Sequence, residues 1–333
     1  MRTRSRRRAL LVGAVAGLAA LPAPRIARAQ GGAAASWPED RVTIGTSLPA
    51  GSSVDITVRA MSESLARRWG KPVVVDNRGG ANGVLACEMV ARARPDGLTL
   101  LATSAMTHAA NPSLYERLPY DPIRDFAAVT RYLNAAFVVM AHKGLGTPTL
   151  DAFVARLRRE PGRHNCGWGS VPSRVATELL RMLAGFDAVH VGYRGNQAGF
   201  PDLLNGRISF MTVDVVGAKP LIDRGAVDAL ALTQAERHPA LPGVPTSAEA
   251  GMPDYLFTTW SGIYAPAGTP PEIVAKIHAD IVTATGSPEV RARLDALGGL
   301  REPPSTPAEF AAFTAAEIES WGRIIRRAGI RLD

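Results

Sequence analysis

The segment Leu48–Asp55 contains the residue types that an anion-binding loop needs. It reads Leu-Pro-Ala-Gly-Ser-Ser-Val-Asp and lies between a β-branched run, Val42–Ile44, and a helical pattern of apolar residues. The first amide N–H groups of a helix have no partner within it, so a strand that turns directly into a helix offers donors to a carboxylate or phosphate. Gly51 leaves the backbone accessible, and Ser52 or Ser53 can cap the helix. Taken alone, the segment is more typical of an ordinary turn, and only the rest of the chain favours a binding site.

Small and polar residues also follow two other predicted strands. Ser104, Thr107 and His108 come after a strand predicted at Leu98–Leu101. Because ligands of open α/β sheets bind outside the carboxyl ends of the strands, we expect these three residues to form a second wall of the same site. The segment His164–Ser170 repeats the order of strand, small loop and helix in the second half of the chain. This repetition indicates two similar lobes facing one another, although no sequence repeat accompanies it.

Four other residues of the second half are candidates for ligand contact. Trp168 lies in a loop aimed at the expected cleft and is equally suited to anchor the domain surface. Asp214 is a polar group at the carboxyl end of a predicted strand, where binding is expected. Tyr193 fits a hinge or pocket position, although core packing suits it slightly better. Ser173 is expected to cap the helix that follows the Gly169–Ser170 loop.

The histidines do not form a pattern that holds a metal ion. His108, His164 and His190 lie on separate predicted elements, and no H-x-x-x-H spacing joins any two of them. A single histidine at the end of a strand more often forms structural hydrogen bonds than it binds a ligand. The sequence therefore predicts neither a metal site nor a cofactor.

The positive charge of the chain is concentrated at its amino terminus. The 333 residues carry a formal net charge of +8, and residues 1–30 contain seven arginines and no acidic residue. The remainder is close to neutral, so the high pI is not evidence for binding to nucleic acid or to an anionic membrane.

Residues 1–29 have the features of a cleavable signal peptide. Five arginines within the first eight residues precede an apolar run, Ala9–Leu21, and Ala27-Arg28-Ala29 forms an A-x-A cleavage pattern. The segment Ser5–Leu10 also resembles a twin-arginine export signal, with Ala9 in place of the usual bulky residue. We therefore expect export to the periplasm, by either route. No later apolar stretch is long enough to cross a bilayer.

The two cysteines, Cys87 and Cys166, exclude a disulfide framework and a cysteine-rich metal site. Export makes a disulfide between them chemically possible, but two buried free thiols fit their predicted positions better. A chain of about 300 residues after cleavage can bury a large core and usually forms two domains.

Strands and helices alternate through most of the chain, which is typical of an α/β fold with a parallel sheet. The strands predicted at Ala136–Met140 and Thr259–Ala265 are expected to carry the chain out of the first domain and back into it. Three helices after the second crossing are expected to wrap the first domain. They are predicted at Ile273–Thr285, Pro288–Leu297 and Pro307–Ala328.

Motifs along the whole predicted mature chain resemble one receptor family. They are L-P-A-G-S-S-V-D at 48–55, V-V-V-D-N-R-G-G-A-N-G at 73–83, A-R-A-R-P-D-G-L-T-L-L at 91–101, N-P-S-L-Y-E-R-L-P-Y-D-P at 111–122, D-F at 125–126, H-V-G-Y-R-G at 190–195, D-L-L-N-G at 202–206, V-P-T-S-A-E-A-G at 244–251 and A-P-A-G-T-P at 265–270. With these motifs in this order, the chain resembles the extracytoplasmic solute receptors of the tripartite tricarboxylate transporter family, the Bug or TctC-like proteins.

The resemblance implies a two-lobed periplasmic binding protein fold of type II-like architecture, with two crossing strands as the hinge. The first domain would then be discontinuous, with residues 37–137 and 262–333, and the second domain would contain residues 138–261. Such receptors capture a small organic acid in the cleft between the lobes.

The resemblance also implies how the acid is held. Backbone amides and ordered water of the loop matching Pro49–Ser53 hold the ligand carboxylate, the loop around Gly169 and Ser170 contributes from the other lobe, and Asp214 meets a ligand amine or hydroxyl. This chain departs from the family in having Gly51-Ser52 where paired glycines are usual, and Trp168 and Pro172 where small residues are common. The full set of expected ligand-binding residues is Pro49, Ala50, Gly51, Ser52, Ser53, Asp55, Ser104, Thr107, His108, Trp168, Gly169, Ser170, Ser173, Tyr193 and Asp214.

The function expected from the resemblance is that of a monomeric receptor that delivers a carboxylate to membrane permease subunits. The same binding event also suits a receptor that presents its ligand-bound form to a sensor kinase. A secreted hydrolase is a third reading, but the chain has no G-x-S-x-G, S-x-x-K or H-E-x-x-H motif and no phosphate loop of the G-x-x-x-x-G-K type. We therefore expect a binding protein and not an enzyme.

Overall fold

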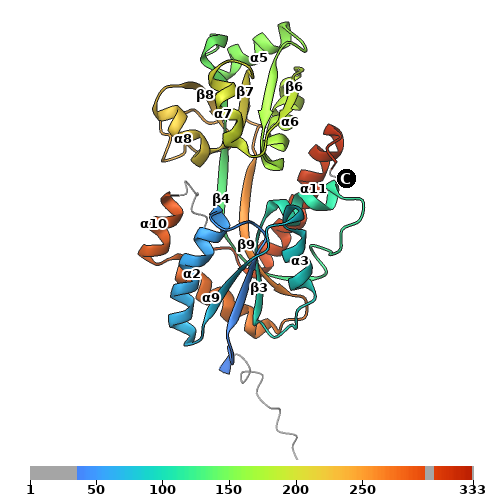
Figure 1. The fold of residues 1–333 in the computed structure, drawn as a ribbon, viewed down its shortest axis with the longest axis vertical. Coiled ribbons are helices and arrows are strands. Elements are labelled where there is room, and N and C mark those ends of the chain that lie inside the picture. Colours follow the sequence, from blue (N-terminus) through green and yellow to red (C-terminus); the bar gives the residue numbers. More distant parts are fainter. Residues whose placement is uncertain (1–35, 297–303, 332–333) are drawn as a thin grey trace, which may run out of the picture.

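The structure is a computed structural model that describes residues 36–296 and 304–331. It consists of two lobes joined by two long strands (Figure 1). The expected two-lobed binding-protein architecture is confirmed. The predicted signal peptide, residues 1–29, lies outside the described residues.

The first lobe is built on parallel strands, as the alternation of strands and helices predicts. Strand β1 pairs with β2 on one side and β3 on the other, both in parallel. Helix α2 connects β1 to β2, and a short 3-10 turn, η1, leads from β2 into α3. The bounds are β1 Val42–Thr46, α2 Ser53–Trp69, β2 Val73–Asn77, η1 Ala81–Gly83, α3 Val84–Ala91, β3 Thr99–Ser104, η2 Met106–Ala110 and α4 Asn111–Leu114.

The hinge consists of strands β4 (Phe126–His142) and β9 (Thr258–Pro266). Strand β4 has 17 residues and is much longer than the sequence predicts. Its first part, to Ala136, pairs antiparallel with β9, and from Phe137 it pairs with β7 and β8 of the second lobe. Strand β9 already pairs with β4 at Thr258, whereas the sequence-based domain limits place the return to the first lobe at residue 262. One strand thus runs through both lobes.

The second lobe repeats the order of strand, loop and helix. Its strands β5, β6 and β7 are parallel, and β7 joins them to β4. Helix α8, which follows β7 directly, is absent from the sequence-based prediction because Gly217 and Pro220 interrupt its helical pattern. The bounds are η3 Lys143–Leu145, α5 Leu150–Arg159, β5 Asn165–Trp168, α6 Val171–Ala184, β6 Val189–Gly192, α7 Asn196–Leu204, β7 Phe210–Asp214, α8 Val215–Asp223 and β8 Val227–Leu232.

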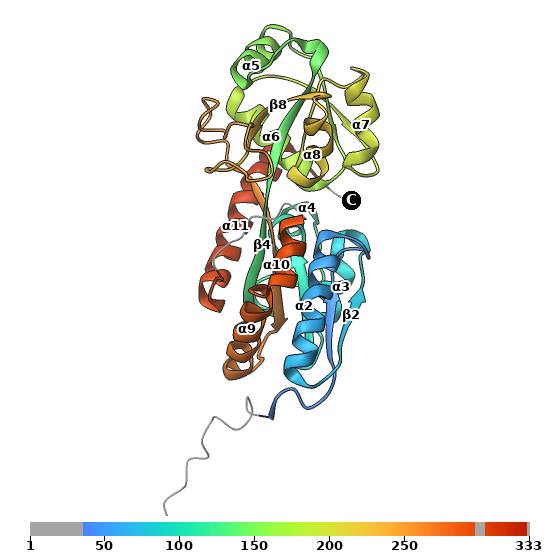
Figure 2. The same cartoon turned by 90° about the vertical axis from the view of Figure 1, so that its left-hand side faces the viewer.

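Three C-terminal helices pack on the first lobe, as predicted: α9 (Pro271–Thr285), α10 (Pro288–Ala296) and α11 (Pro307–Ala328). Helices α2 and α9 cover one face of the first-lobe sheet, while α3 and α11 cover the other. Helix α11 also contacts α6 of the second lobe. Figure 2 shows α11 extending from the lower lobe toward the upper one, on the side of the hinge away from α3 and α7.

The buried residues include both cysteines. Cys87 and Cys166 are free and have no exposed surface, so the expected free thiols are confirmed. No helix of the described residues combines the length and the apolar character needed to cross a membrane.

Candidate functional site

The first-lobe loop is held by the helix that follows it. Ser52 is the N-cap of α2, and its hydroxyl oxygen accepts the amide N–H of Asp55 at 3.3 Å. In return, the Asp55 carboxylate accepts the N–H of Gly51 at 2.8 Å. The same carboxylate also accepts Arg59 Nε at 2.9 Å and Asn77 Nδ2 at 2.8 Å. The loop is therefore tied to both α2 and the end of β2.

These contacts make Asp55 an internal brace of the loop. The side chain is only 3% exposed. Burial would raise the pKa of Asp55, but the hydrogen bonds from Gly51, Asn77 and Arg59 outweigh it and hold the pKa below its ordinary value. The carboxylate stays ionised, and its oxygens are occupied by protein donors. The N–H of Gly51, which was expected to bind the ligand, already donates to the Asp55 carboxylate.

The glycine-rich segment after β2 packs closely against the first-lobe loop. A Cβ on Gly79 would lie 2.5 Å from the Pro49 nitrogen, so only glycine allows the two backbones to approach so closely. Gly83 has φ +83°, and a Cβ there would lie 2.6 Å from Thr107 Cγ2. In the sequence, Asn77 and these glycines are recognisable only as parts of the family motif at 73–83. Their structural role is to shape the wall behind Pro49.

Thr107 and His108 lie inside the first lobe and not on the surface of a loop. The Thr107 hydroxyl contacts the Thr103 hydroxyl at 2.5 Å and His108 Nδ1 at 2.9 Å. The His108 ring has no exposed surface and stacks on Tyr264, with ring centroids 4.1 Å apart. Burial lowers the pKa of His108 to about 3, so the ring is neutral. The structure therefore removes both residues from the expected second wall and leaves Ser104, 9% exposed, at its edge.

The second-lobe loop begins a capped helix in the same way. The N-cap of α6 is Ser170, whose hydroxyl oxygen accepts the amide N–H of Ser173 at 3.3 Å. The prediction that Ser173 is the cap is wrong. Its own hydroxyl donates to the Thr212 carbonyl at 2.5 Å, and its side chain is fully buried. Ser173 thus fastens α6 to strand β7.

Gly169 is packed against the start of α7. Its N–H donates to Asn196 Oδ1 at 2.9 Å, and a Cβ on Gly169 would overlap the backbone of Gly195 and Asn196. Asn196 is 8% exposed and was not among the expected site residues. No signal beyond its place after the Gly-Tyr-Arg-Gly turn marks it in the sequence.

Trp168 and Tyr193 pack against their own lobe. Trp168 lies beside Gly192 of the neighbouring strand, and the Arg174 guanidinium lies 4.9 Å from the centroid of its ring. The Tyr193 hydroxyl donates to Asp202 Oδ2 at 2.8 Å. Burial raises the pKa of Tyr193 to about 12. The structure thus supports domain packing for both aromatic side chains, and Arg174 is half-buried rather than freely solvated.

Asp214 caps a third helix. Its carboxylate accepts the N–H of Gly217 at 2.8 Å at the start of α8. The position of a Cβ on Gly217 lies 3.5 Å from both Asp214 carboxylate oxygens and 3.7 Å from Gln197 Nε2. Gln197, exposed in the first turn of α7, therefore lies close to Asp214 and was not predicted. Together they form a polar corner on the second lobe.

Three helices thus begin at the carboxyl ends of strands β1, β5 and β7, each with one side-chain cap. A cap occupies the third amide of the helix and leaves the first two. Among the hydrogen bonds of the described residues, none uses the amide N–H of Val54 or Val171. Nor does any join Leu48–Ser52 to the second lobe within the described part of the chain. The site offers neutral backbone donors from both lobes.

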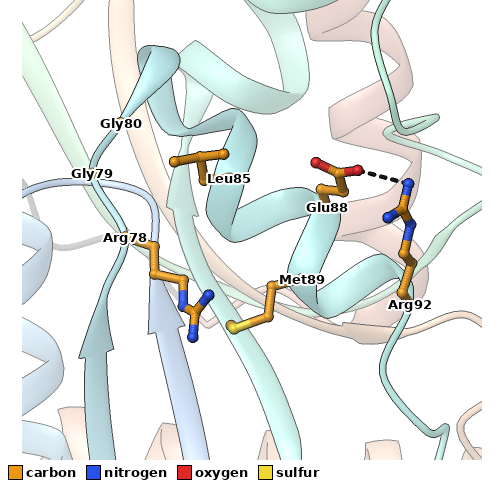
Figure 3. Close-up of a pocket in the computed structure, with 7 residues that line it drawn as sticks. All are labelled: Arg78, Gly79, Gly80, Leu85, Glu88, Met89 and Arg92. Carbon is orange, nitrogen blue, oxygen red and sulfur yellow. Dashed lines mark ion pairs between the residues drawn. The ribbon is translucent and has the colours of Figure 1, made fainter.

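A separate depression of about 530 Å³ lies between the glycine-rich segment and α3 (Figure 3). Its charged side chains are already paired, Arg92 with Glu88 at 2.6 Å and Arg78 with Asp76 at 2.8 Å. Both arginines therefore already have an acidic partner, and we assign the depression no binding role.

Cys166, His190 and Glu178 form a chain of contacts that superficially matches a cysteine–histidine–acid arrangement. Cys166 Sγ lies 3.4 Å from His190 Nδ1, and His190 Nε2 lies 2.5 Å from Glu178 Oε1. The thiol has no exposed surface, and burial raises the pKa of Cys166 to about 12. A buried neutral thiol is a poor nucleophile. These residues join α6 to the sheet, and the described residues contain no cluster able to hold a metal ion.

The two lobes, the strands that cross between them and the paired helix ends define a solute-binding protein. A family model described as the tripartite tricarboxylate transporter family receptor matches residues 57–330, and the chain belongs to this family. This confirms the resemblance seen in the motifs.

Relatives and solved structures agree with that assignment. Protein BugT of Bordetella pertussis is 29% identical over 302 residues, covering 89% of this chain and 92% of BugT. A Rhodopseudomonas palustris protein solved with adipate is 30% identical with a TM-score of 0.75, over 89% of this chain and 100% of that one. MatC of R. palustris with bound malate is 32% identical with a TM-score of 0.72, over 87% and 100%.

Proposed function

We propose that this receptor captures a small organic acid between its lobes and delivers it to the permease of a tripartite tricarboxylate-type transporter. The observation that carries the proposal is the pair of capped helix ends, α2 and α6, which leave backbone donors at the facing ends of the two lobes. The similar structures with adipate and malate support a dicarboxylate as the class of ligand.

The donors would come from both lobes. The amides of Val54 in the first lobe and of Val171 in the second have no protein partner among the described residues. The hydroxyl groups of Ser52 and Ser170 accept one hydrogen bond each as caps and can still donate their own proton. The helix dipoles add positive potential at the N-termini of α2 and α6, and no buried cation is needed.

The other residues of the site would have different roles, depending on where they lie. Pro49, Ala50 and Gly51 are exposed and would form the rim of the first-lobe loop. Asp214 and Gln197 would meet a hydroxyl or amine on the far end of the ligand. Asp55 and Asn196 would act as positioning residues, because they hold the loops and not the ligand.

Lobe closure about β4 and β9 would bring the two sets of donors together. We propose that the protein works in the periplasm after removal of residues 1–29, as a monomer, and that binding occurs without turnover. Small-angle scattering with saturating acid should give a smaller radius of gyration than without it. An unchanged radius at saturation argues against closure.

The direct test is a panel of organic acids, including malate, adipate, succinate and citrate, followed by calorimetry and thermal unfolding. A ligand at about 100 times its dissociation constant should add about 2.7 kcal/mol to the free energy of unfolding. The concentration of the acid should stay constant during prolonged incubation. Consumption of many equivalents of any acid would reject the receptor function in favour of an enzyme.

A further inference from the structure

A second cavity, of about 800 Å³, lies behind the hinge. It is bordered by the segments 233–235 and 254–258 of the second lobe and the hinge, and by helix α11 of the first lobe. None of the loop residues of the candidate acid site lines it. Figure 2 shows α11 and these segments on one side of β4, whereas α3 and α7 lie on the other side. The cavity and the acid site therefore have no lining residue in common.

The cavity draws its walls from both lobes, and its lining combines apolar residues with polar and charged ones, including the exposed Arg323 and Arg327. Leu179 and Met182 project from α6, while Trp321 and Ile324 project from α11. Trp321 packs on Phe257 at the hinge, with ring centroids 4.9 Å apart. Aromatic and aliphatic walls around a volume of this size are typical of small-molecule sites.

Two buried or half-buried side chains of the cavity lining, Gln234 and Glu317, present hydrogen-bond acceptors. Gln234 is 6% exposed, and its Nε2 donates to the Glu236 carbonyl at 2.6 Å. Its Oε1 is buried and has no hydrogen-bond partner. An unpaired buried carbonyl carries a cost in free energy, which a donor from a ligand would remove.

Glu317 supplies a second acceptor. One carboxylate oxygen, Oε2, accepts the indole N–H groups of Trp260 at 3.1 Å and Trp321 at 3.0 Å. This arrangement fixes the carboxyl group in the wall of the cavity. The polar end of the cavity thus combines two acceptor side chains, Gln234 and Glu317, which matches a ligand with a donor head group.

We propose that this hinge-back cavity binds a small organic molecule with an aromatic or aliphatic body and a head group that donates hydrogen bonds, an amine or a hydroxyl. The head group meets Gln234 Oε1 and Glu317, and the body lies between Met182, Leu256 and Trp321. Because α6 and α11 belong to different lobes, an occupant links the lobes behind the hinge. Its binding is therefore coupled to closure of the cleft in front, and the coupling is reciprocal.

The probe for this site is 2-phenylethylamine, with 2-phenylethyl methyl ether as the analogue whose head group has no donor. Methyl-labelled methionine provides the readout, since Met182 lines the cavity and Met61 lies in the first-lobe core. We expect the amine to shift the Met182 resonance saturably and to leave Met61 unchanged. The ether should bind about fivefold more weakly or worse, as expected for the loss of a hydrogen bond.

Two variants locate the site. Gln234→Leu removes the unpaired acceptor at similar volume, and Leu256→Ser changes a wall residue that is 51% exposed and so does not endanger folding. Both should weaken the amine about fivefold or more. The matched control is Leu183→Ser, an exposed position of α6 outside this cavity, which should bind the amine as the wild type does.

Absence of any Met182 shift, or equal binding by wild type and Leu256→Ser, would overturn the proposal. Equal binding of the amine and the ether would overturn the donor assignment. The readout does not depend on acid binding, so a failure of the receptor function leaves this test intact. A change in acid affinity when the amine is saturating measures the coupling across the hinge, and an unchanged affinity would reject it.

Discussion

The two loops that face each other across the cleft are built alike but braced by different chemistry. In each, a serine caps a helix with the same 3.3 Å contact, Ser52 on α2 and Ser170 on α6. In each, a glycine N–H is held by a side chain. Gly51 donates to the charged carboxylate of Asp55, whereas Gly169 donates to the neutral amide of Asn196.

The difference shows that a shared motif can be held in place by unrelated forces. The first-lobe loop depends on an ionised group with three protein donors, so its stability responds to pH. The second-lobe loop depends on close packing of two backbones, so its stability responds to volume. In both, the glycine N–H positions the loop, and the donors left for a ligand are the next amides along the helix.

The largest expected effect comes from exchanging the two glycines for alanine. At Gly169 a Cβ overlaps the backbone of Gly195 and Asn196, so Gly169→Ala should lower the free energy of unfolding by about 3 kcal/mol or more and abolish acid binding. At Gly51 nothing lies within 4 Å and only the positive φ of +81° is strained, so Gly51→Ala should cost about 1 kcal/mol. Urea unfolding of both variants measures the contrast, and equal losses would contradict it.

Removal of the two side chains that hold the glycine N–H groups, Asp55 and Asn196, should destabilise the protein unequally. Asp55→Ala deletes a buried carboxylate with three partners and should cost about 3 kcal/mol, whereas Asn196→Ala removes one neutral hydrogen bond and should cost about 1 kcal/mol. Chemical denaturation at pH 7 gives both numbers. A larger loss of unfolding free energy for Asn196→Ala than for Asp55→Ala would show that the charged contact is not the stronger one.

The pH dependence of stability should also differ between the Asp55 and Asn196 variants. The pKa of Asp55 is held below its ordinary value in the folded protein. Its stabilising contribution is therefore complete above the unfolded-state pKa of about 4 and is lost as the pH falls through the lower folded-state value. The stability difference between wild type and Asp55→Asn should shrink as the pH falls below about 4, and the difference for Asn196→Ala should change less. Parallel pH profiles for the two variants would refute this distinction.

The two caps should have the smallest and most similar effects. Ser52→Ala and Ser170→Ala each remove one capping hydrogen bond and should each cost about 1 kcal/mol. Thermal unfolding measures both. If the losses in the free energy of unfolding differ by more than about 1.4 kcal/mol, one of the two serines makes a stabilising contact besides the cap.

Much of the fold follows from the sequence because local rules agree with the tertiary structure. The Leu48–Asp55 turn into a helix and the three C-terminal helices are all predicted from the sequence. The full length of β4 was not, since nothing local shows that one strand serves two sheets. Helix α8 was missed because Gly217 and Pro220 conceal its pattern.

The site could be predicted only in part. The sequence locates the loops, but it does not reveal which amides are already occupied. Gly51 and Gly169 look like free donors until Asp55 and Asn196 are placed beside them. His108 follows a strand end and still lies in the core, because the chain turns inward after Ser104. The Gly169–Asn196 contact joins residues 27 positions apart, which the local sequence does not reveal, whereas Asp55 lies only four residues after Gly51.

The most direct test of the account is amide NMR during titration with a dicarboxylate such as malate or adipate. We expect the amide protons of Val54 and Val171 to shift together and to saturate at one ligand per protein. We expect smaller shifts for Gly51 and Gly169, whose N–H groups already have partners. If the acid binds and these two amides do not respond, or if only one lobe responds at saturation, the helix ends of the two lobes do not hold the ligand.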